Sequence, residues 1–181
     1  MTKQLKLFGW LAAVSAVGIV ASFWQLLEKL ALLENKDVAL SCNLNDVFSC
    51  SSVLNASQSS VFGFPNPIIG LVMFTFFLSV AIFGLSGAKI VKRLALTIQG
   101  LALFMLGFTL WLFYENTYST KAICLFCLFN GTAVVIINAV MLRHNTVYIP
   151  KLKRLTTKGA DLFGWSLLWL AVAFAMLLKF A

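Results

Sequence analysis

Charged side chains are scarce in this sequence, and acidic ones are the scarcest. Charge falls on 11% of the 181 residues, with 6 Asp and Glu against 14 Lys and Arg, whereas 61% of the residues are hydrophobic and the mean hydropathy is +0.94. The apolar share of a soluble domain is usually about half. The composition therefore excludes a water-soluble domain and indicates an integral membrane protein.

Five stretches lack charge for long enough, or nearly long enough, to cross a membrane as helices, which takes roughly 20 apolar residues. They are residues 7–27, 68–88, 94–114, 122–142 and 162–178, of which the last is the shortest. The polar segment 34–37 has no A-x-A-like cleavage site before it, so we expect the first stretch to be retained rather than removed as a signal peptide. The expected fold is a single all-α integral membrane domain over residues 1–181, with a four-helix-bundle core and a fifth, C-terminal transmembrane helix.

Basic residues are distributed unequally between the two ends of the expected helices. Ten of the 14 fall on the side of the N-terminus, and these are Lys3, Lys6, Lys89, Lys92, Arg93, Arg143, Lys151, Lys153, Arg154 and Lys158. Lys and Arg near helix ends are retained on the cytoplasmic side. We therefore expect a cytoplasmic N-terminus, an external C-terminus and an external loop over residues 31–64. Because topology accounts for the net charge of +8, we expect no nucleic-acid partner.

Four cysteines form two pairs that both fall on the expected external side, where disulfides are permitted. Cys42 and Cys50 lie in the loop, and Cys124 and Cys127 form a C-x-x-C motif at the start of the fourth stretch. Three residues apart, Cys124 and Cys127 share one helix face, and the positive end of the helix dipole favours their thiolate forms. We expect Cys127 to face the bundle interior, where a membrane quinone could reach it from the lipid.

The loop pair has a different setting. Polar residues surround Cys42 and Cys50, which we expect to leave this pair open to a protein partner. The moderately apolar segment 51–64 predicts a short interfacial helix that caps the core and excludes water from the pocket below. Asn66 stands between two prolines and is by default a helix-start residue, whose side chain can also face that pocket.

Two plainer explanations of the cysteines stay open. They could form two structural disulfides, although a bundle of this apolarity hardly needs them. They could bind zinc, but C-x7-C and C-x-x-C half-sites at a membrane interface are unusual for a closed structural site, so we expect no metal. His144 is expected to be a solvated loop residue on the cytoplasmic side, from which it cannot serve the external thiols.

Several motifs together resemble the vitamin K epoxide reductase family, over about residues 7–142, and in particular its prokaryotic members without a fused thioredoxin-like domain. The matching features are the loop cysteines with seven residues between them, the segment 51–54, the run 62–65 that leads through Asn66 to Gly70, and the motif 124–127. Each motif alone is weak, whereas the set is specific.

The resemblance implies a role for each of these residues. Cys124 and Cys127 match the active-site pair, with Cys127 next to the quinone. Cys42 and Cys50 match a shuttle pair that takes electrons from a thioredoxin-like partner. We expect Cys50 to exchange with Cys124 and Cys42 to meet the partner, although the spacing lets either loop cysteine reach Cys124. Asn66 matches an asparagine that hydrogen-bonds a quinone carbonyl, where a donor stabilises developing charge.

Two departures from the family pattern bear on function. Gly131 occupies the position of a tyrosine in the animal epoxide reductases, so a second donor is missing and simple quinone reduction is favoured over epoxide reduction. Many bacterial homologues continue from a fifth helix into a thioredoxin-like domain, whereas this sequence stops at Ala181. We therefore expect the partner to be a separate periplasmic or extracellular thioredoxin-fold oxidase.

The sequence thus predicts a multi-pass thiol oxidoreductase of a bacterial or archaeal cytoplasmic (inner) membrane. It would oxidise a thioredoxin-like partner, reduce a quinone of the ubiquinone, menaquinone or vitamin K type, and support disulfide bond formation, with its active site on the external side. Two alternatives remain. One is a vitamin K quinone or epoxide reductase, and the other is a non-enzymatic membrane scaffold with structural disulfides.

Overall fold

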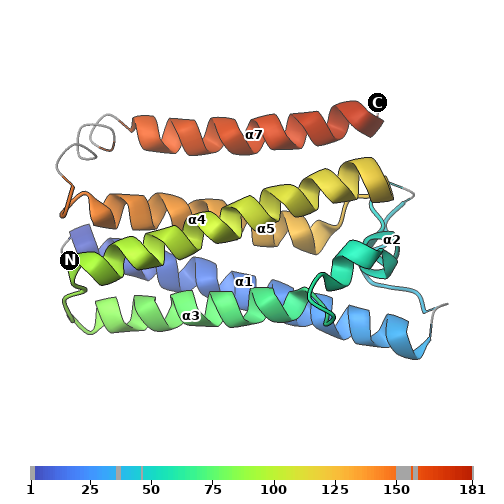
Figure 1. The fold of residues 1–181 in the computed structure, drawn as a ribbon, viewed down its shortest axis with the longest axis horizontal. Coiled ribbons are helices and arrows are strands. Elements are labelled where there is room, and N and C mark those ends of the chain that lie inside the picture. Colours follow the sequence, from blue (N-terminus) through green and yellow to red (C-terminus); the bar gives the residue numbers. More distant parts are fainter. Residues whose placement is uncertain (1–2, 36–37, 46, 150–155, 157–158, 181) are drawn as a thin grey trace.

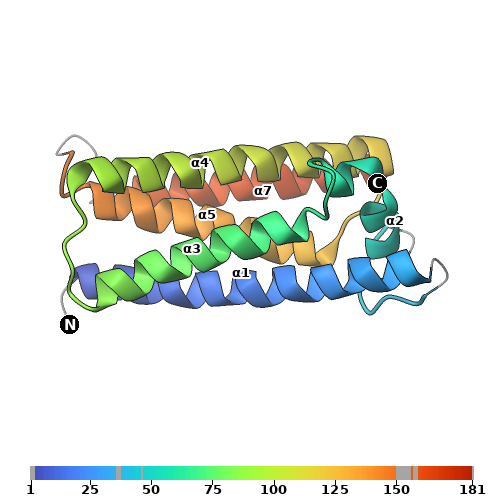
Figure 2. The same ribbon diagram turned by 60° about the horizontal axis from the view of Figure 1, so that its bottom comes forward.

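A computed structural model describes residues 3–35, 38–45, 47–149, 156 and 159–180, and these residues form a helical bundle (Figure 1). The long helices of this part of the chain are α1 (Lys3–Glu34), α3 (Pro67–Leu85), α4 (Lys92–Glu115), α5 (Leu125–Asn145) and α7 (Ala160–Phe180). Helix α5 packs against α1, α4 and α7, and α1 packs along α3, as two views of the ribbon show (Figures 1 and 2).

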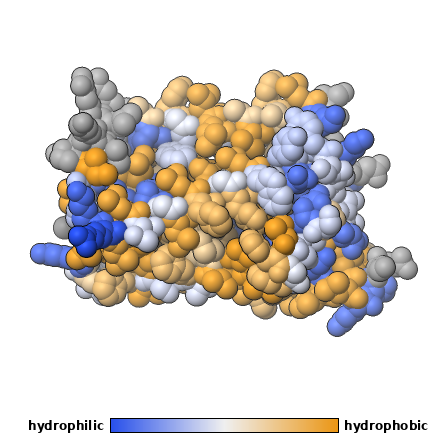
Figure 3. All heavy atoms as spheres, viewed as in Figure 1, coloured by the Kyte–Doolittle hydropathy of each residue, from blue (hydrophilic) through white to orange (hydrophobic). Residues whose placement is uncertain are grey.

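The surface and the helix lengths fit a membrane. Within the described residues, four segments are long and apolar enough to cross it, and these are Gln4–Glu34, Pro67–Leu85, Lys92–Thr120 and Leu125–Asn145. Helix α7 adds a shorter apolar segment, Ala160–Met176. Apolar side chains cover the middle of the molecule and polar ones gather at its two ends (Figure 3). The predicted class, an all-α membrane protein with a fifth apolar helix beside a four-helix core, is confirmed.

Glycines let α1 and α3 approach closely. A Cβ added at Gly18 of α1 would lie 2.4 Å from the ring of Phe74, and one added at Gly84 of α3 would lie 2.4 Å from the ring of Phe8. Each ring therefore fills the space left by a glycine on the facing helix. Between membrane helices, where lipid is as apolar as the core, such close packing is a main source of association.

A cap of two short helices lies across one end of the bundle, which we call the cysteine end, whereas the sequence predicted one short helix. Helix α2 (Cys50–Asn55) begins at Ser49, whose side chain accepts a hydrogen bond from the Ser52 N–H, as an N-cap serine does. The 3₁₀ helix η1 (Ser57–Ser60) follows after an extended residue, Ala56. The cap is placed where it can cover the ends of the long helices.

The far end of the bundle corrects one expectation. His144, expected as a solvated loop residue, is buried in the last turn of α5, so that prediction was wrong. The reason is that α5 continues to Asn145, which brings the His144 Nδ1 within 2.9 Å of the Gln4 Oε1 and its ring against Phe8. Other expectations lie outside the described residues, namely those that rest on Lys151, Lys153, Arg154 and Lys158, and on residues 36–37 and 46 of the loop 31–64.

Candidate active site

The two cysteine pairs are brought together by a backbone contact between segments far apart in the sequence. Phe48 and Ile123 form an isolated parallel bridge, in which the Ile123 N–H donates to the Val47 carbonyl at 2.7 Å. Cys50 follows the first segment and opens α2, and Cys124 follows the second and precedes α5. The bridge therefore sets these two cysteines side by side.

Four sulfur atoms consequently lie at the cysteine end. Cys42 and Cys50 are joined by a disulfide, with their Cα atoms 5.7 Å apart, and Cys124 and Cys127 are free thiols. The Cys50 Sγ lies 3.6 Å from the Cys124 Sγ. A thiolate attacks a disulfide through direct sulfur–sulfur contact, so this arrangement suits exchange between the pairs.

The loop pair is not open to solvent, contrary to the expectation from its polar sequence. Cys42 is 2% exposed, Cys50 0% and Cys124 1%. Apolar side chains from α1, the loop, α2 and the segment before α5 pack around them, namely Leu32, Leu40, Val53, Leu54 and Ala122. Their polar neighbours Ser41, Asn43 and Ser52 are exposed, whereas the cysteines are buried. A protein partner could reach the disulfide only after this loop moves.

The last turns of α1 hold the loop and the cap in place. At about 1.5 Å per residue, this 32-residue helix is roughly 48 Å long, which exceeds the roughly 30 Å of a hydrocarbon core. The carboxylate of Glu28 accepts hydrogen bonds from the Ser41 N–H at 3.2 Å and from the Ser41 hydroxyl. The Lys29 ammonium donates to the Leu54 carbonyl and, at 3.1 Å, to the Ser59 hydroxyl. Ser41, which precedes Cys42, and the cap that begins at Cys50 are thus tied to α1.

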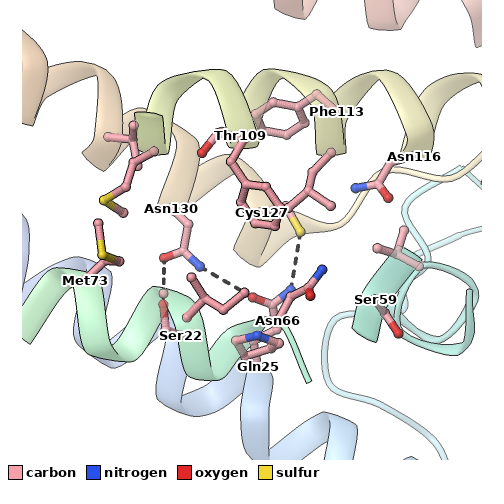
Figure 4. A pocket seen from close by; sticks show the side chains of 18 of the residues that line it. Ser22, Gln25, Ser59, Asn66, Met73, Thr109, Phe113, Asn116, Cys127 and Asn130 are labelled. Carbon is pink, nitrogen blue, oxygen red and sulfur yellow. Dashed lines mark hydrogen bonds between the residues drawn. The ribbon is translucent and has the colours of Figure 1, made fainter. Parts of the chain in front are cut away.

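A carboxamide on α1 contacts both free thiols, and no sequence motif indicated it. The Gln25 Nε2 lies 3.3 Å from the Cys127 Sγ and 3.6 Å from the Cys124 Sγ. Its Oε1 accepts from the Asn130 Nδ2 at 3.4 Å, and the Ser22 hydroxyl donates to the Asn130 Oδ1 at 3.4 Å (Figure 4). A signal was present, because polar residues inside a membrane helix are costly and mark functional sites.

A cavity of about 120 Å³ lies beside Cys127, between α1, α3, α4, α5 and the cap (Figure 4). Its wall is largely apolar and includes Ile69, Met73, Phe104, Phe108 and Leu112. Phe104 is also 64% exposed, so the cavity reaches the outer surface of α4. An apolar cavity with a few convergent polar groups and a nucleophile is the usual form of a ligand site.

Asn66 lies on the wall of this cavity, at the start of α3. Its carboxamide is engaged by the protein on both sides. The Nδ2 donates to the Gln58 carbonyl at 2.6 Å, and the Oδ1 accepts from the Val61 N–H at 3.1 Å. In this arrangement Asn66 fastens η1 to the start of α3.

The position of Gly131 is covered by α7. A Cβ there would lie 2.4 Å from the Trp169 indole and 2.7 Å from the Phe113 ring. These two rings pack edge to face, with centroids 5.4 Å apart. A larger side chain at residue 131 is therefore excluded by the fifth helix, which gives α7 a definite place against the core.

Comparison with known proteins identifies this arrangement. A family model described as the vitamin K epoxide reductase family matches residues 9–144. The chain belongs to the vitamin K epoxide reductase family. The match to this family covers the helices that enclose the cavity and both cysteine pairs, whereas α7 follows it. No curated protein sequence matches the chain. As a vitamin K epoxide reductase family member, the protein is a membrane thiol–disulfide oxidoreductase, as the sequence motifs predicted, and members of this family generally use a quinone.

Proposed function

We propose that this protein oxidises a thioredoxin-fold partner on the external side of a bacterial or archaeal cytoplasmic membrane and reduces a membrane quinone. Electrons would enter through Cys42 and Cys50, pass to Cys124 and Cys127, and leave from Cys127 to the quinone. The observation that carries this proposal is the 3.6 Å contact between the Cys50 Sγ and the Cys124 Sγ, with Cys127 on the wall of the cavity.

The proposed cycle begins with both pairs oxidised. A partner thiolate attacks the Cys42 sulfur, and Cys50 leaves as a thiolate. Cys50 then attacks the Cys124 sulfur of the Cys124–Cys127 disulfide, which releases the Cys127 thiolate. The second partner thiol resolves the partner–Cys42 disulfide and frees Cys42, which attacks Cys50 and restores the Cys42–Cys50 disulfide. The partner leaves oxidised, and Cys124 and Cys127 are both reduced.

The second half of the cycle consumes those electrons. The Cys124 and Cys127 thiols give two electrons to the quinone and close to a disulfide, and their two protons convert the quinone to hydroquinone. The redox state of the structure, with the Cys42–Cys50 disulfide closed and two free thiols, corresponds to the state before this step. Gln25 supports it, because a hydrogen-bond donor within 3.3 Å of the Cys127 Sγ favours the thiolate.

The cavity supports a quinone as the electron acceptor. Its wall is apolar, it adjoins Cys127, and it reaches the outer surface of α4, where a lipid-soluble molecule could enter. The energetics agree as well. Strongly oxidising thioredoxin-fold partners have potentials near about −120 mV, so the terminal acceptor must be more oxidising still, as a respiratory quinone can be. Oxidative protein folding would be the biological output.

The first experiment places the acceptor beside one sulfur. Purified Cys124→Ala protein, reduced and then mixed with menadione, should show a thiolate–quinone charge-transfer absorption from Cys127. The band should disappear in the Cys124→Ala, Cys127→Ala double variant and persist in a Cys124→Ala, Cys42→Ala control. If a folded and reduced Cys124→Ala protein gives no band, the proposal fails and structural disulfides in a membrane scaffold become the better explanation.

Wild-type protein separates the proposed oxidase from the alternative within the family. A vitamin K epoxide reductase would turn over an epoxide substrate, whereas the proposed oxidase would reduce the quinone alone. The space at Gly131 is filled by Trp169, so the structure offers no side-chain donor at that position. We expect quinone reduction without measurable epoxide reduction, assayed side by side with the same dithiol reductant.

A further inference from the structure

We propose that the side-chain amide of Asn116 is a binding group for a ring oxygen of the quinone. It would donate to the carbonyl of the oxidised form and accept from the hydroxyl of the reduced form. This inference rests on the proposed function and adds a residue that the sequence motifs did not indicate.

Asn116 is a buried polar residue on the cavity wall whose side-chain oxygen is left unpaired. Its side chain is 2% exposed, and within the described part of the chain no group hydrogen-bonds its Oδ1. Figure 4 shows its amide directed into the cavity, beyond Cys127 and across from Ser59. A buried polar group without a partner costs free energy, so it needs an explanation, and a polar ligand provides one.

The backbone of Asn116 has a structural role that its side chain does not share. Residues Asn116–Thr120 form a single π-helical turn, η2, at the end of α4. The Asn116 carbonyl accepts hydrogen bonds from the N–H of Lys121 and, at 3.1 Å, from that of Ala122, so it closes the turn that leads to Cys124. Turns of this kind occur often at functional sites. The backbone carbonyl would accept these two hydrogen bonds whichever side chain stood at residue 116.

Neighbouring carboxamides in the cavity are already engaged by the protein. Asn66 bonds the Gln58 carbonyl and the Val61 N–H. The amides of Gln25 and Asn130 bond each other, and Gln25 also bonds the thiols. Each of these side chains therefore has a protein partner for both its nitrogen and its oxygen, whereas the Asn116 oxygen has none among the described residues.

A carboxamide fits the reaction because it carries both a donor and an acceptor. The quinone presents carbonyl oxygens, which need donors, and negative charge grows on them as electrons arrive from Cys127. A donor placed there stabilises that charge. The hydroquinone presents hydroxyl groups, which need acceptors, and the Asn116 Oδ1 can take that role. One side chain can therefore serve both forms.

The test compares Asn116→Leu, which keeps the branched shape of the side chain and removes the polar atoms, with wild type in the reduction of menadione by a dithiol. We expect kcat/KM for menadione to fall by about 10- to 100-fold, while the rate at which the dithiol reduces Cys124 and Cys127 is unchanged. The matched control is Asn145→Leu. Asn145 is likewise buried with an unpaired Oδ1, but it ends α5 at the far end of the bundle, and its variant should keep the wild-type kcat/KM.

Thermal unfolding gives an independent measurement. Without menadione, Asn116→Leu should unfold at the wild-type temperature or above it, because an unpaired buried amide has been removed. The rise that menadione causes in wild type should shrink in the variant and remain in Asn145→Leu. If Asn116→Leu fails to fold, Asn116→Ala is measured in its place, with the same expectation for kcat/KM and for the menadione-induced rise.

The inference is overturned if the variant keeps the wild-type kcat/KM, or if it is destabilised without menadione and keeps the full menadione-induced rise. Those results would make Asn116 a structural residue. Failure of the proposed function is a separate result, because wild type itself would then neither reduce menadione nor be stabilised by it.

Discussion

The two ends of the bundle use similar buried polar residues in different ways. Towards the far end, the Asn138 amide donates to the carbonyls of Ala102 and Val134, both at 2.9 Å, and Arg143 pairs with Asp161 at 2.6 Å. These polar groups bond the protein's own backbone and charges, and they hold helices together. They face no reactive atom.

At the cysteine end, polar groups converge on sulfur and on a cavity instead. Gln25 bonds two thiols, and Asn116 faces the cavity with its oxygen unpaired. A buried carboxamide by itself therefore does not mark a site. At the cysteine end the amides are directed at thiols or at the cavity, and this distinguishes them from the amides towards the far end. Paired substitutions at the two ends can test that distinction.

The largest expected effect comes from removing the sulfur that adjoins the cavity. Cys127→Ala should abolish dithiol-driven menadione reduction, because no thiolate then faces the quinone, while stability changes by less than about 1 kcal/mol. The control is Met141→Leu, which exchanges two side chains of similar volume in the buried core towards the far end. This variant should keep activity. Absorbance of menadione and thermal unfolding would be followed together. A Cys127→Ala protein that still reduced menadione would contradict the role assigned to Cys127.

The next effect in size concerns the amide on the thiols. Gln25→Leu should lower the rate of menadione reduction about tenfold or more, because the hydrogen bond that favours the thiolate is lost. When Gln25→Leu is added to the Cys124→Ala protein, the charge-transfer band should also appear at a higher pH than without it. Gln99→Leu is the control, since Gln99 bonds the Asn138 Oδ1 at 3.3 Å, away from any sulfur. Equal losses in both variants would show a general packing effect.

A smaller effect is expected from loosening the cap. Lys29→Met removes the ammonium that bonds the Leu54 carbonyl and the Ser59 hydroxyl, so the cap should open more often. After reduction, alkylation of Cys42 should quicken by roughly three- to tenfold, as expected if the two lost hydrogen bonds together contribute about 1 kcal/mol. Arg143→Met breaks a contact at the far end and should leave this rate unchanged. Mass spectrometry of quenched samples would measure both, and equal rates in wild type and Lys29→Met would contradict the assigned role.

The smallest effect on activity is expected where α7 meets the core. Gly131→Ala places a methyl group 2.4 Å from the Trp169 indole and should cost about 1–3 kcal/mol of stability, with activity within about twofold of wild type. Gly100→Ala on α4 has nothing within 4 Å of the new Cβ, and it should be neutral or stabilising because alanine favours a helix. Apparent unfolding temperatures in detergent would be measured for both variants. Identical shifts in Gly131→Ala and Gly100→Ala would disprove the contact between residue 131 and Trp169.

Much of the fold could be predicted because hydrophobic length and cysteine spacing are local signals. The long apolar stretches and the C-x-x-C motif are visible in the sequence itself, and the family match agrees with them. The C-terminal end of α5 was harder to predict from the sequence. Nothing local shows that the helix runs on to Asn145, so His144 was taken for a loop residue although Gln4 and Phe8 enclose it.

The rest of the site depends on contacts between segments distant in the sequence. Polar neighbours suggested an open Cys42, yet the fold turns this residue inward. Gln25, Lys29 and Asn116 were missed for the same reason, since each lies in or beside an apolar stretch and acquires its partners or its cavity only when α1, α4 and the cap meet.

The parallel bridge between Phe48 and Ile123 also bears on the speed of the proposed cycle. Because it holds the Cys50 and Cys124 sulfurs in contact, exchange between the two pairs is intramolecular and needs no diffusion. Effective molarities of well-oriented intramolecular reactions reach on the order of 10⁵–10⁸ M. The internal transfer should therefore be fast, and the throughput of the protein should be set by the arrival of its partner and the exchange of quinone with the lipid.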